Sequence, residues 1–204
     1  TKIPVIGRFV KASERAFTGY LNVLRVNSFD AIAKEYIAGG LAPSKNPEVF
    51  IGLSNFINTA TGRTKFPGIL KGAAPILNTV FFSPRLLASR VQMFNPQWYF
   101  SLPPPVRKLA VKSFLKMVGA GTLLVSLASL HPDADVEIDP RSSDFGKMKV
   151  GNQRIDIWTG YAQYVRLAGQ LVTEKHKSGS GMVTYMPRIE SFDRFVSSKF
   201  SPAM

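Results

Sequence analysis

The sequence predicts a mainly α fold with a small antiparallel β-hairpin or sheet (α+β), built as one multi-helix domain. Apolar residues recur at spacings of three and four over most of the chain, as one face of an α-helix requires. Pro and Gly cluster between these periodic segments, where they separate helices. One short stretch, 134–158, instead alternates apolar and charged residues around Gly151-Asn152, which is typical of strands joined by a tight turn.

The first predicted helix runs from Ser13 to Ile37 and ends before Gly39-Gly40. A second, shorter helix is expected at about 47–61. The apolar stripe of the first helix is expected to face the core, and it contains Phe17, Tyr20, Leu21, Leu24, Phe29, Ile32 and Ala33.

The third helix is expected to begin at Ser83-Pro84, since Ser can cap a helix and Pro fits its first position, and to stop at Asn95-Pro96. The state of the apolar segment 73–82 stays open. A triple proline at 103–105 is a stiff spacer and a helix entry, and the longest helix is predicted after it, at 106–130.

Beyond this helix the pattern changes to strands. Residues 134–139 predict a half-exposed strand, and 147–150 with 153–158 predict a hairpin whose type II′ turn has Gly151 first. A last amphipathic helix is expected after a cap at Thr159. The predicted organisation is therefore an N-terminal helical region (1–102), a region with the long helix, hairpin and last helix (103–177) packed with it as one domain, and a linker and tail (178–204) that starts with Ser-Gly-Ser-Gly.

Charge is distributed unevenly along the chain. The net charge is +13, and residues 49–132 contain nine Lys and Arg but no Asp or Glu. Such a surface attracts an acidic partner, which indicates DNA, RNA, an anionic membrane or an acidic protein face. Lys108, Lys112 and Lys116 are four residues apart and must share one face of the long helix. The predicted anion-binding residues of this block are these lysines with Arg85, Arg90 and Arg107.

The hairpin supplies a second basic group, in which Lys149 faces Arg154 and Lys147 lies nearby. An anion could bridge these side chains. The favoured interpretation is that three carboxylates of the neighbouring strand, Asp135, Glu137 and Asp139, neutralise them in salt bridges. A calcium loop is the weaker alternative, since the sixth-position Gly and twelfth-position Glu of that motif are missing.

Residues Met117–Leu130 carry no charge. As a helix this run spans about 21 Å, short of the roughly 30 Å hydrocarbon core of a bilayer. We therefore expect a buried core helix. The alternative is an interfacial or conditionally inserting helix, whose membrane-contacting candidates are Met117, Leu123, Leu124, Val125, Leu127 and Leu130.

No arrangement typical of an enzyme was found. The chain has no Cys, and its two His residues, His131 and His176, stand in polar or proline contexts that predict surface positions. The segment 61–65 lacks the order of residues of a phosphate loop and a preceding strand. We expect no catalytic residues, no metal and no cofactor in this chain.

Two stretches resemble a block found in very large polyvalent or internal virion proteins of tailed bacteriophages. The matching positions run from about Phe56 to Leu171, and the specific phrases are FFSPRLLASR (81–90) and DPRSSDFGKMKVGN (139–152). The resemblance implies a non-enzymatic virion protein, held in the capsid interior or portal region and delivered into the host with the genome. The start at Thr1 then suggests a segment of a longer protein.

The partners that this resemblance and the charge imply are other virion proteins (portal or ejection-complex subunits), DNA through non-specific phosphate contacts, and the host membrane, with oligomer formation open. Two alternatives remain. The chain could be a membrane-active or channel-forming module of an ejection apparatus, or an accessory domain of a very large virion enzyme.

Overall fold

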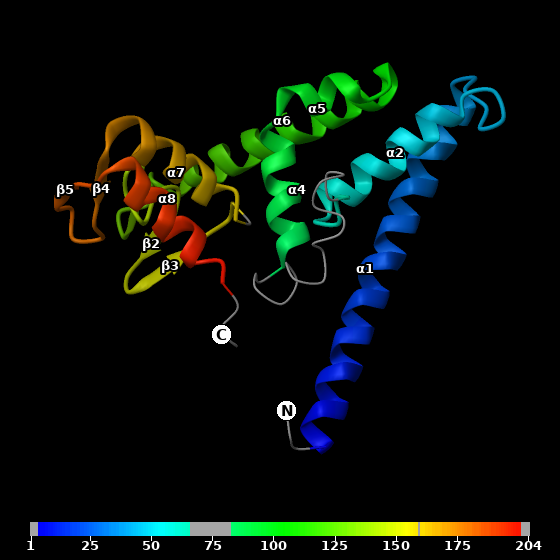
Figure 1. Ribbon diagram of the computed structural model, residues 1–204. Helices are drawn as coiled ribbons and strands as arrows, with labels where there is room; N and C mark the ends of the chain where they lie inside the picture. Colours follow the sequence, from blue (N-terminus) through cyan, green and yellow to red (C-terminus); the bar gives the residue numbers. More distant parts are fainter. Residues whose placement is uncertain (1–3, 66–82, 159, 201–204) are drawn as a thin grey trace.

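The computed structural model describes residues 4–65, 83–158 and 160–200 (Figure 1). It is mainly helical with two small antiparallel sheets, which confirms the predicted fold class. The elements in chain order are α1 (Pro4–Ala38), α2 (Pro47–Ala60), α4 (Pro84–Phe94), α5 (Pro96–Ser101), α6 (Pro104–Ala128), β1 (Ala134–Val136), β2 (Met148–Val150), β3 (Gln153–Ile155), α7 (Ala162–Thr173), β4 (Lys175–Lys177), β5 (Val183–Tyr185) and α8 (Arg188–Ser197).

Proline is the first residue of five of the described helices, α1, α2, α4, α5 and α6. Pro84 occupies the first position of α4, as predicted, but Ser83 has a φ of 52° and its side chain makes no capping bond, so its predicted capping role is wrong. Asn95 ends α4 and begins α5, where its side chain accepts a hydrogen bond from the Gln97 amide at 3.0 Å. Because one Asn serves both helices, the chain turns sharply between them.

The core lies where α2 packs against α1, α4 and α6. Leu53, Val106 and Ala110 are fully buried at the α2–α6 contact. The triple proline belongs to this packing, since a Cβ at Gly52 would lie 2.7 Å from Pro103 Cδ. The Tyr36 hydroxyl of α1 also donates to the Pro105 carbonyl at 3.1 Å. The triple proline, which leads into α6, is therefore held by both α1 and α2.

Helix α1 begins at Pro4, nine residues before the predicted start, and only its C-terminal part reaches the core. Ala33 is buried and Phe29 packs against the core, whereas Phe17 and Tyr20 are 64% and 62% exposed. The prediction that the whole stripe faces the core is thus wrong for its first half. The reason is that α1 extends past the end of α2 (Figure 1), which leaves this part of the helix uncovered.

The prediction of a buried core helix at Met117–Leu130 is also wrong. The buried residues of α6 are Val106 and Ala110, both before this run. Leu123, Leu127 and Leu130 are 59%, 55% and 80% exposed. The physical reason is that α2 covers only the first turns of α6, and the second half continues beyond it toward the sheets (Figure 1).

The three-stranded sheet has the order β1-β2-β3 with antiparallel neighbours. The predicted hairpin register is confirmed, with Met148 opposite Ile155 and Lys149 opposite Arg154. Gly151 has a φ of +57° and Asn152 does not have a positive φ, as a type II′ turn requires. The strands are shorter than predicted.

Residues 178–200, predicted as part of a linker and tail, form a hairpin turn, a strand and a helix instead. Strands β4 and β5 pair as an antiparallel hairpin, and Ser178-Gly179-Ser180-Gly181 forms its turn. The Ser178 amide closes the turn by donating a hydrogen bond to the Met182 carbonyl at 2.9 Å. Helix α8 then packs against α7. The predicted cap Thr159 and the segment 73–82 lie outside the described residues.

Trp158 fastens the sheet region to α6. Its Nε1 donates to the Gly146 carbonyl at 2.8 Å, and its ring lies over Gly121, where a Cβ would stand 2.7 Å from Cζ3. Gly119, on the same helix, has no atom within 4 Å of its would-be Cβ. Position 121 therefore has no room for a side chain because the indole ring lies against it, whereas position 119 has room for one.

We predict that Gly121→Ala destabilises the protein and Gly119→Ala stabilises it. Displacing the indole should cost about 1–3 kcal/mol, whereas an exposed helical Gly→Ala change should gain roughly 0.5–1 kcal/mol. Urea unfolding followed by tryptophan fluorescence measures both. Equal effects of the two substitutions would show that Trp158 is not docked on α6.

Candidate anion-binding surface

The basic residues predicted from the sequence do not form one patch. Lys108, Lys112 and Lys116 lie together on α6, and the hairpin residues lie on the separate three-stranded sheet. Arg85 is exposed on α4, whereas Arg90 on the same helix is half-buried. The structure therefore offers several sites of different character.

The lysine row of α6 is the most open of these sites. Lys108, Lys112 and Lys116 are exposed and line one shallow hollow of about 800 Å³, which confirms that they share a face. Val111 and Leu115 lie between them and are also exposed. Within the described residues, none of the three lysines forms an ion pair. This face is cationic and apolar at once.

The apolar part of α6 continues the same face. Leu123 follows Lys116 by seven residues, and Leu127 and Leu130 follow at intervals of four and three. Residues at these spacings lie on one side of a helix. The outward side of α6 therefore has lysines over its first half and exposed leucines over its second half. We call it the α6 face, with Lys108, Lys112, Lys116, Leu123 and Leu127 on the helix and Leu130 in the turn directly after it.

Two of the predicted arginines are engaged with the protein itself. The Arg107 guanidinium donates to the carbonyls of Tyr99, Phe100 and Leu102 at 3.1, 2.9 and 3.1 Å, and so binds the C-terminal end of α5. The Arg90 guanidinium lies 4.2 Å from the ring centroid of Tyr161. Contact of these two residues with an anion stays a prediction, and their packing leaves the lysines as the more accessible cations.

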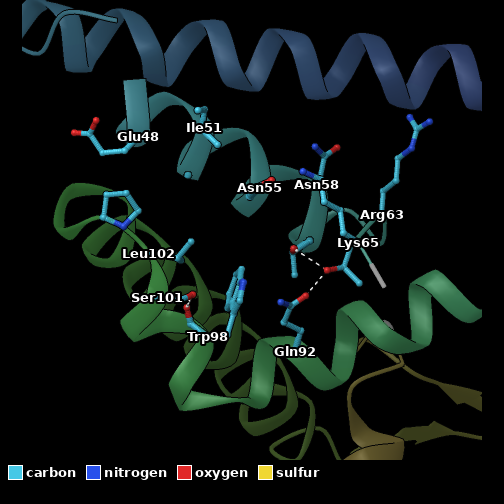
Figure 2. Close-up of a pocket in the computed structure, with 14 residues that line it drawn as sticks. Glu48, Ile51, Asn55, Asn58, Arg63, Lys65, Gln92, Trp98, Ser101 and Leu102 are labelled. Carbon is cyan, nitrogen blue, oxygen red and sulfur yellow. Dashed lines mark hydrogen bonds between the residues drawn. The ribbon is translucent and has the colours of Figure 1, made fainter. Parts of the chain in front are cut away.

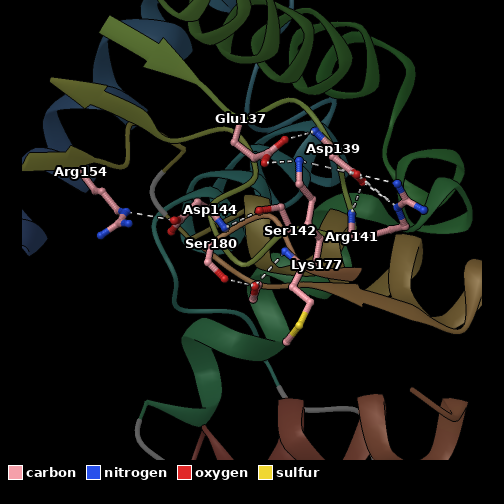
Figure 3. A network of polar contacts seen from close by, with 10 residues as sticks. Glu137, Asp139, Arg141, Ser142, Asp144, Arg154, Lys177 and Ser180 are labelled. Atoms are coloured by element: carbon pink, nitrogen blue, oxygen red, sulfur yellow. Dashed lines mark hydrogen bonds and ion pairs between the residues drawn. The ribbon is translucent and has the colours of Figure 1, made fainter. Parts of the chain in front are cut away.

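Two of the three hairpin cations are neutralised inside the chain, and Figure 3 shows the pairing of Arg154 with Asp144. Lys147 and Arg154 both pair with Asp144, at 2.8 and 2.9 Å. The favoured salt-bridge interpretation is thus confirmed for these two cations, but the carboxylate is Asp144 and not one of the neighbouring strand. Lys149 is exposed and forms no ion pair with a described residue.

The carboxylates before Asp144 have partners of their own. Asp139 pairs with Arg141 at 2.7 Å, and Glu137 with Lys177 of β4 at 2.6 Å. Lys177 was missed in the sequence, because its position beside this loop depends on the hairpin that the tail forms. Among the described residues, no three His, Cys, Asp or Glu side chains are grouped as a metal ion requires.

Hydrogen bonding from Arg141 lowers the pKa of Asp139 to about 2. The side-chain hydrogen bond from Lys147 likewise lowers the pKa of Asp144. Both carboxylates therefore favour the folded state while they are ionised, and this network fastens β4 to the three-stranded sheet.

A second hollow, of about 510 Å³, lies between α2, the C-terminal end of α4 and the α5–α6 turn (Figure 2). Asn55, Asn58, Arg63 and Trp98 are among its lining residues. Its buried hydroxyls are satisfied within the protein, since the Thr59 hydroxyl donates to Thr64 Oγ1 and the Thr64 hydroxyl contacts Gln92 Oε1. The segment 61–65 follows a helix and not a strand, so its local structure also differs from a phosphate loop.

Comparisons of the chain with protein-family models, with curated proteins and with solved structures gave no match. The resemblance to virion proteins therefore stays a hypothesis, and the geometry carries the functional argument.

We predict that Asp139→Asn lowers the free energy of unfolding at pH 6 and that the difference from the wild type shrinks as the pH falls to about 2. The folded-state pKa lies below the usual value of about 3.9, so the stabilisation is present above about pH 4 and is lost on going toward pH 2. Urea unfolding at several pH values measures this. Asp193→Asn, at an exposed residue of α8, is the matched control. A difference that stays constant down to pH 2 would contradict the pairing.

Proposed function

We propose that the protein is a non-enzymatic binding component that attaches to an anionic membrane surface through the α6 face. The observation that carries this proposal is a row of exposed lysines, which form no ion pair with any described residue, together with exposed leucines along one side of a single helix. Each Lys close to an anionic bilayer contributes about 1 kcal/mol. Buried leucines add roughly 25 cal/mol for each Å² of apolar surface removed from water.

The length of the apolar part favours a helix lying in the interface. Among the described residues, α6 is long and apolar enough to cross a bilayer. Its uncharged part, Met117–Leu130, nevertheless spans only about 21 Å of a core of roughly 30 Å. Trp158 also holds the opposite side of α6 against the sheet region. A helix that places its lysines at the headgroups and its leucines just beneath them satisfies both constraints.

The biological setting rests on the resemblance alone. In that setting the chain is a virion component of a tailed bacteriophage, packaged or ejected with the genome, and it meets DNA, neighbouring virion proteins and then the host membrane. DNA requires phosphate contacts from Lys108, Lys112 and Lys116 but gives the exposed leucines no role. The leucines therefore favour the membrane over DNA as the partner of this face.

Charge reversal of the lysine row tests the electrostatic part. We predict that Lys108→Glu/Lys112→Glu/Lys116→Glu loses at least about 100-fold in affinity for vesicles with phosphatidylglycerol at low salt, since three favourable contacts of about 1 kcal/mol become repulsive. Co-flotation measures the bound fraction. Lys34→Glu/Lys45→Glu/Lys175→Glu, which changes the net charge equally at exposed sites elsewhere, should float like the wild type.

The same variants separate the membrane from DNA. If the wild-type protein ignores these vesicles but binds a duplex fragment with the same dependence on the lysine row, the partner is DNA and the membrane proposal is wrong.

Substitution of the leucines tests the apolar part. We predict that Leu123→Ser/Leu127→Ser abolishes the binding that remains at high salt, because salt screens the lysines and leaves apolar burial as the attraction. Flotation at increasing salt measures it. Ile138→Ser/Val172→Ser, at two residues that are each 78% exposed outside α6, is the control. An unchanged salt curve for the α6 variant would rule out insertion of these leucines.

A further inference from the structure

A small pocket of about 170 Å³ lies between α7, β4 and α8, apart from the α6 face. It is lined by polar side chains from all three elements and from the loop before β2. Its ionisable and hydroxyl-bearing members are Ser143, Arg166, His176, Ser191, Arg194, Ser198 and Lys199. No carboxylate is among the described residues that line it.

Two of its cations have no acidic partner among the described residues. The Arg166 guanidinium donates to the Ser143 carbonyl, and Lys199 Nζ donates to Gln163 Oε1 and lies 4.9 Å from the ring centroid of Phe195. These partners are all neutral. Arg194 differs, since it forms an ion pair with Glu190 at 3.4 Å on the exposed side of α8.

The fold thus holds Arg166 and Lys199 near each other, and no carboxylate of residues 4–65, 83–158 or 160–200 pairs with either. Burial lowers the pKa of Lys199, and the charge of Arg166 lowers it further. Two half-buried like charges are unfavourable in the ligand-free protein, and a bound anion would remove the penalty.

Ser191 is a second, independent signal. It is 2% exposed, and its hydroxyl has no hydrogen-bond partner among the described residues. A buried polar group without a partner costs about 1–3 kcal/mol. Its backbone amide donates a hydrogen bond to the Pro187 carbonyl at 3.0 Å. Of its two donors, only the side-chain hydroxyl therefore has no partner among the described residues. A hydroxyl at this position is therefore available to a ligand in the pocket.

We propose that this pocket binds a tetrahedral oxyanion, either inorganic phosphate or the phosphate group of a small monoester. Arg166 and Lys199 supply the positive charge, and the Ser191 hydroxyl supplies a neutral donor. Charge-assisted hydrogen bonds of this kind are the strongest that phosphate makes in proteins. The pocket volume suits an anion of a few heavy atoms.

The test is calorimetric titration of the full chain with inorganic phosphate at constant ionic strength, set with chloride. We expect the wild type to bind and both Lys199→Gln and Ser191→Ala to bind at least tenfold more weakly. Ser197→Ala is the matched control, because its hydroxyl donates to the Arg194 carbonyl and lies outside the pocket lining. Absence of phosphate binding by the wild type, or binding by either pocket variant that is as tight as that of the wild type, would overturn the proposal.

Thermal unfolding without phosphate distinguishes a ligand-binding hydroxyl from a structural one. Ser191→Ala should be as stable as the wild type or more stable, since it removes an unsatisfied group. A large loss of stability would mean that the hydroxyl has a partner within the fold, and would also overturn the proposal.

Two further measurements identify the ligand and show that the pocket binds it independently of the α6 face. Tighter binding of glycerol 3-phosphate than of inorganic phosphate would identify a phosphate ester as the ligand, and the reverse order would identify the free ion. The Lys108→Glu/Lys112→Glu/Lys116→Glu variant should bind phosphate like the wild type, so failure of the membrane proposal and failure of this one give different results.

Discussion

The contact between α2 and the first turns of α6 sets the orientation of the surface that we propose to be functional. Leu53 and Val106 are fully buried there, and Gly52 allows the ring of Pro103 to approach the α2 backbone. Because this contact uses one side of α6, the lysine row on the opposite side must point into solvent. The helix then continues past α2, and its leucines are left uncovered. Attachment of one end of a long helix thus produces both parts of the α6 face.

Electrostatics divides the chain into regions with different roles. Glu137, Asp139 and Asp144 each form an ion pair, and the pair of Glu137 with Lys177 links β4 to the segment that follows β1. The lysines of α6 and the pair Arg166–Lys199 have no such partner among the described residues. Cations without an acidic partner add little to the stability of a fold. These are therefore the places where an external anion would neutralise the excess positive charge.

The sequence predicted the parts of the candidate surface that depend on local spacing. A separation of four residues was sufficient to place Lys108, Lys112 and Lys116 on one face, and the Gly-Asn pair was sufficient for the hairpin register. It could not predict that Asp144 neutralises Arg154, because a loop brings them together. The Ser191 pocket was missed for the same reason. Its residues come from α7, β4, α8 and a loop, and its last element lies in a segment whose pattern did not predict a helix.

What the sequence by itself determined was therefore the class of the fold, the entry of the helices at prolines and the alignment of charges along α6, since these follow from covalent geometry and helical periodicity. Tertiary structure decided which apolar faces are covered. The stripes at Phe17–Leu24 and Met117–Leu130 have the pattern of core helices, yet both lie where no other described helix packs over them. An apolar stripe indicates that one face of a helix favours burial. Whether another part of the same chain buries that face depends on how the neighbouring elements are arranged.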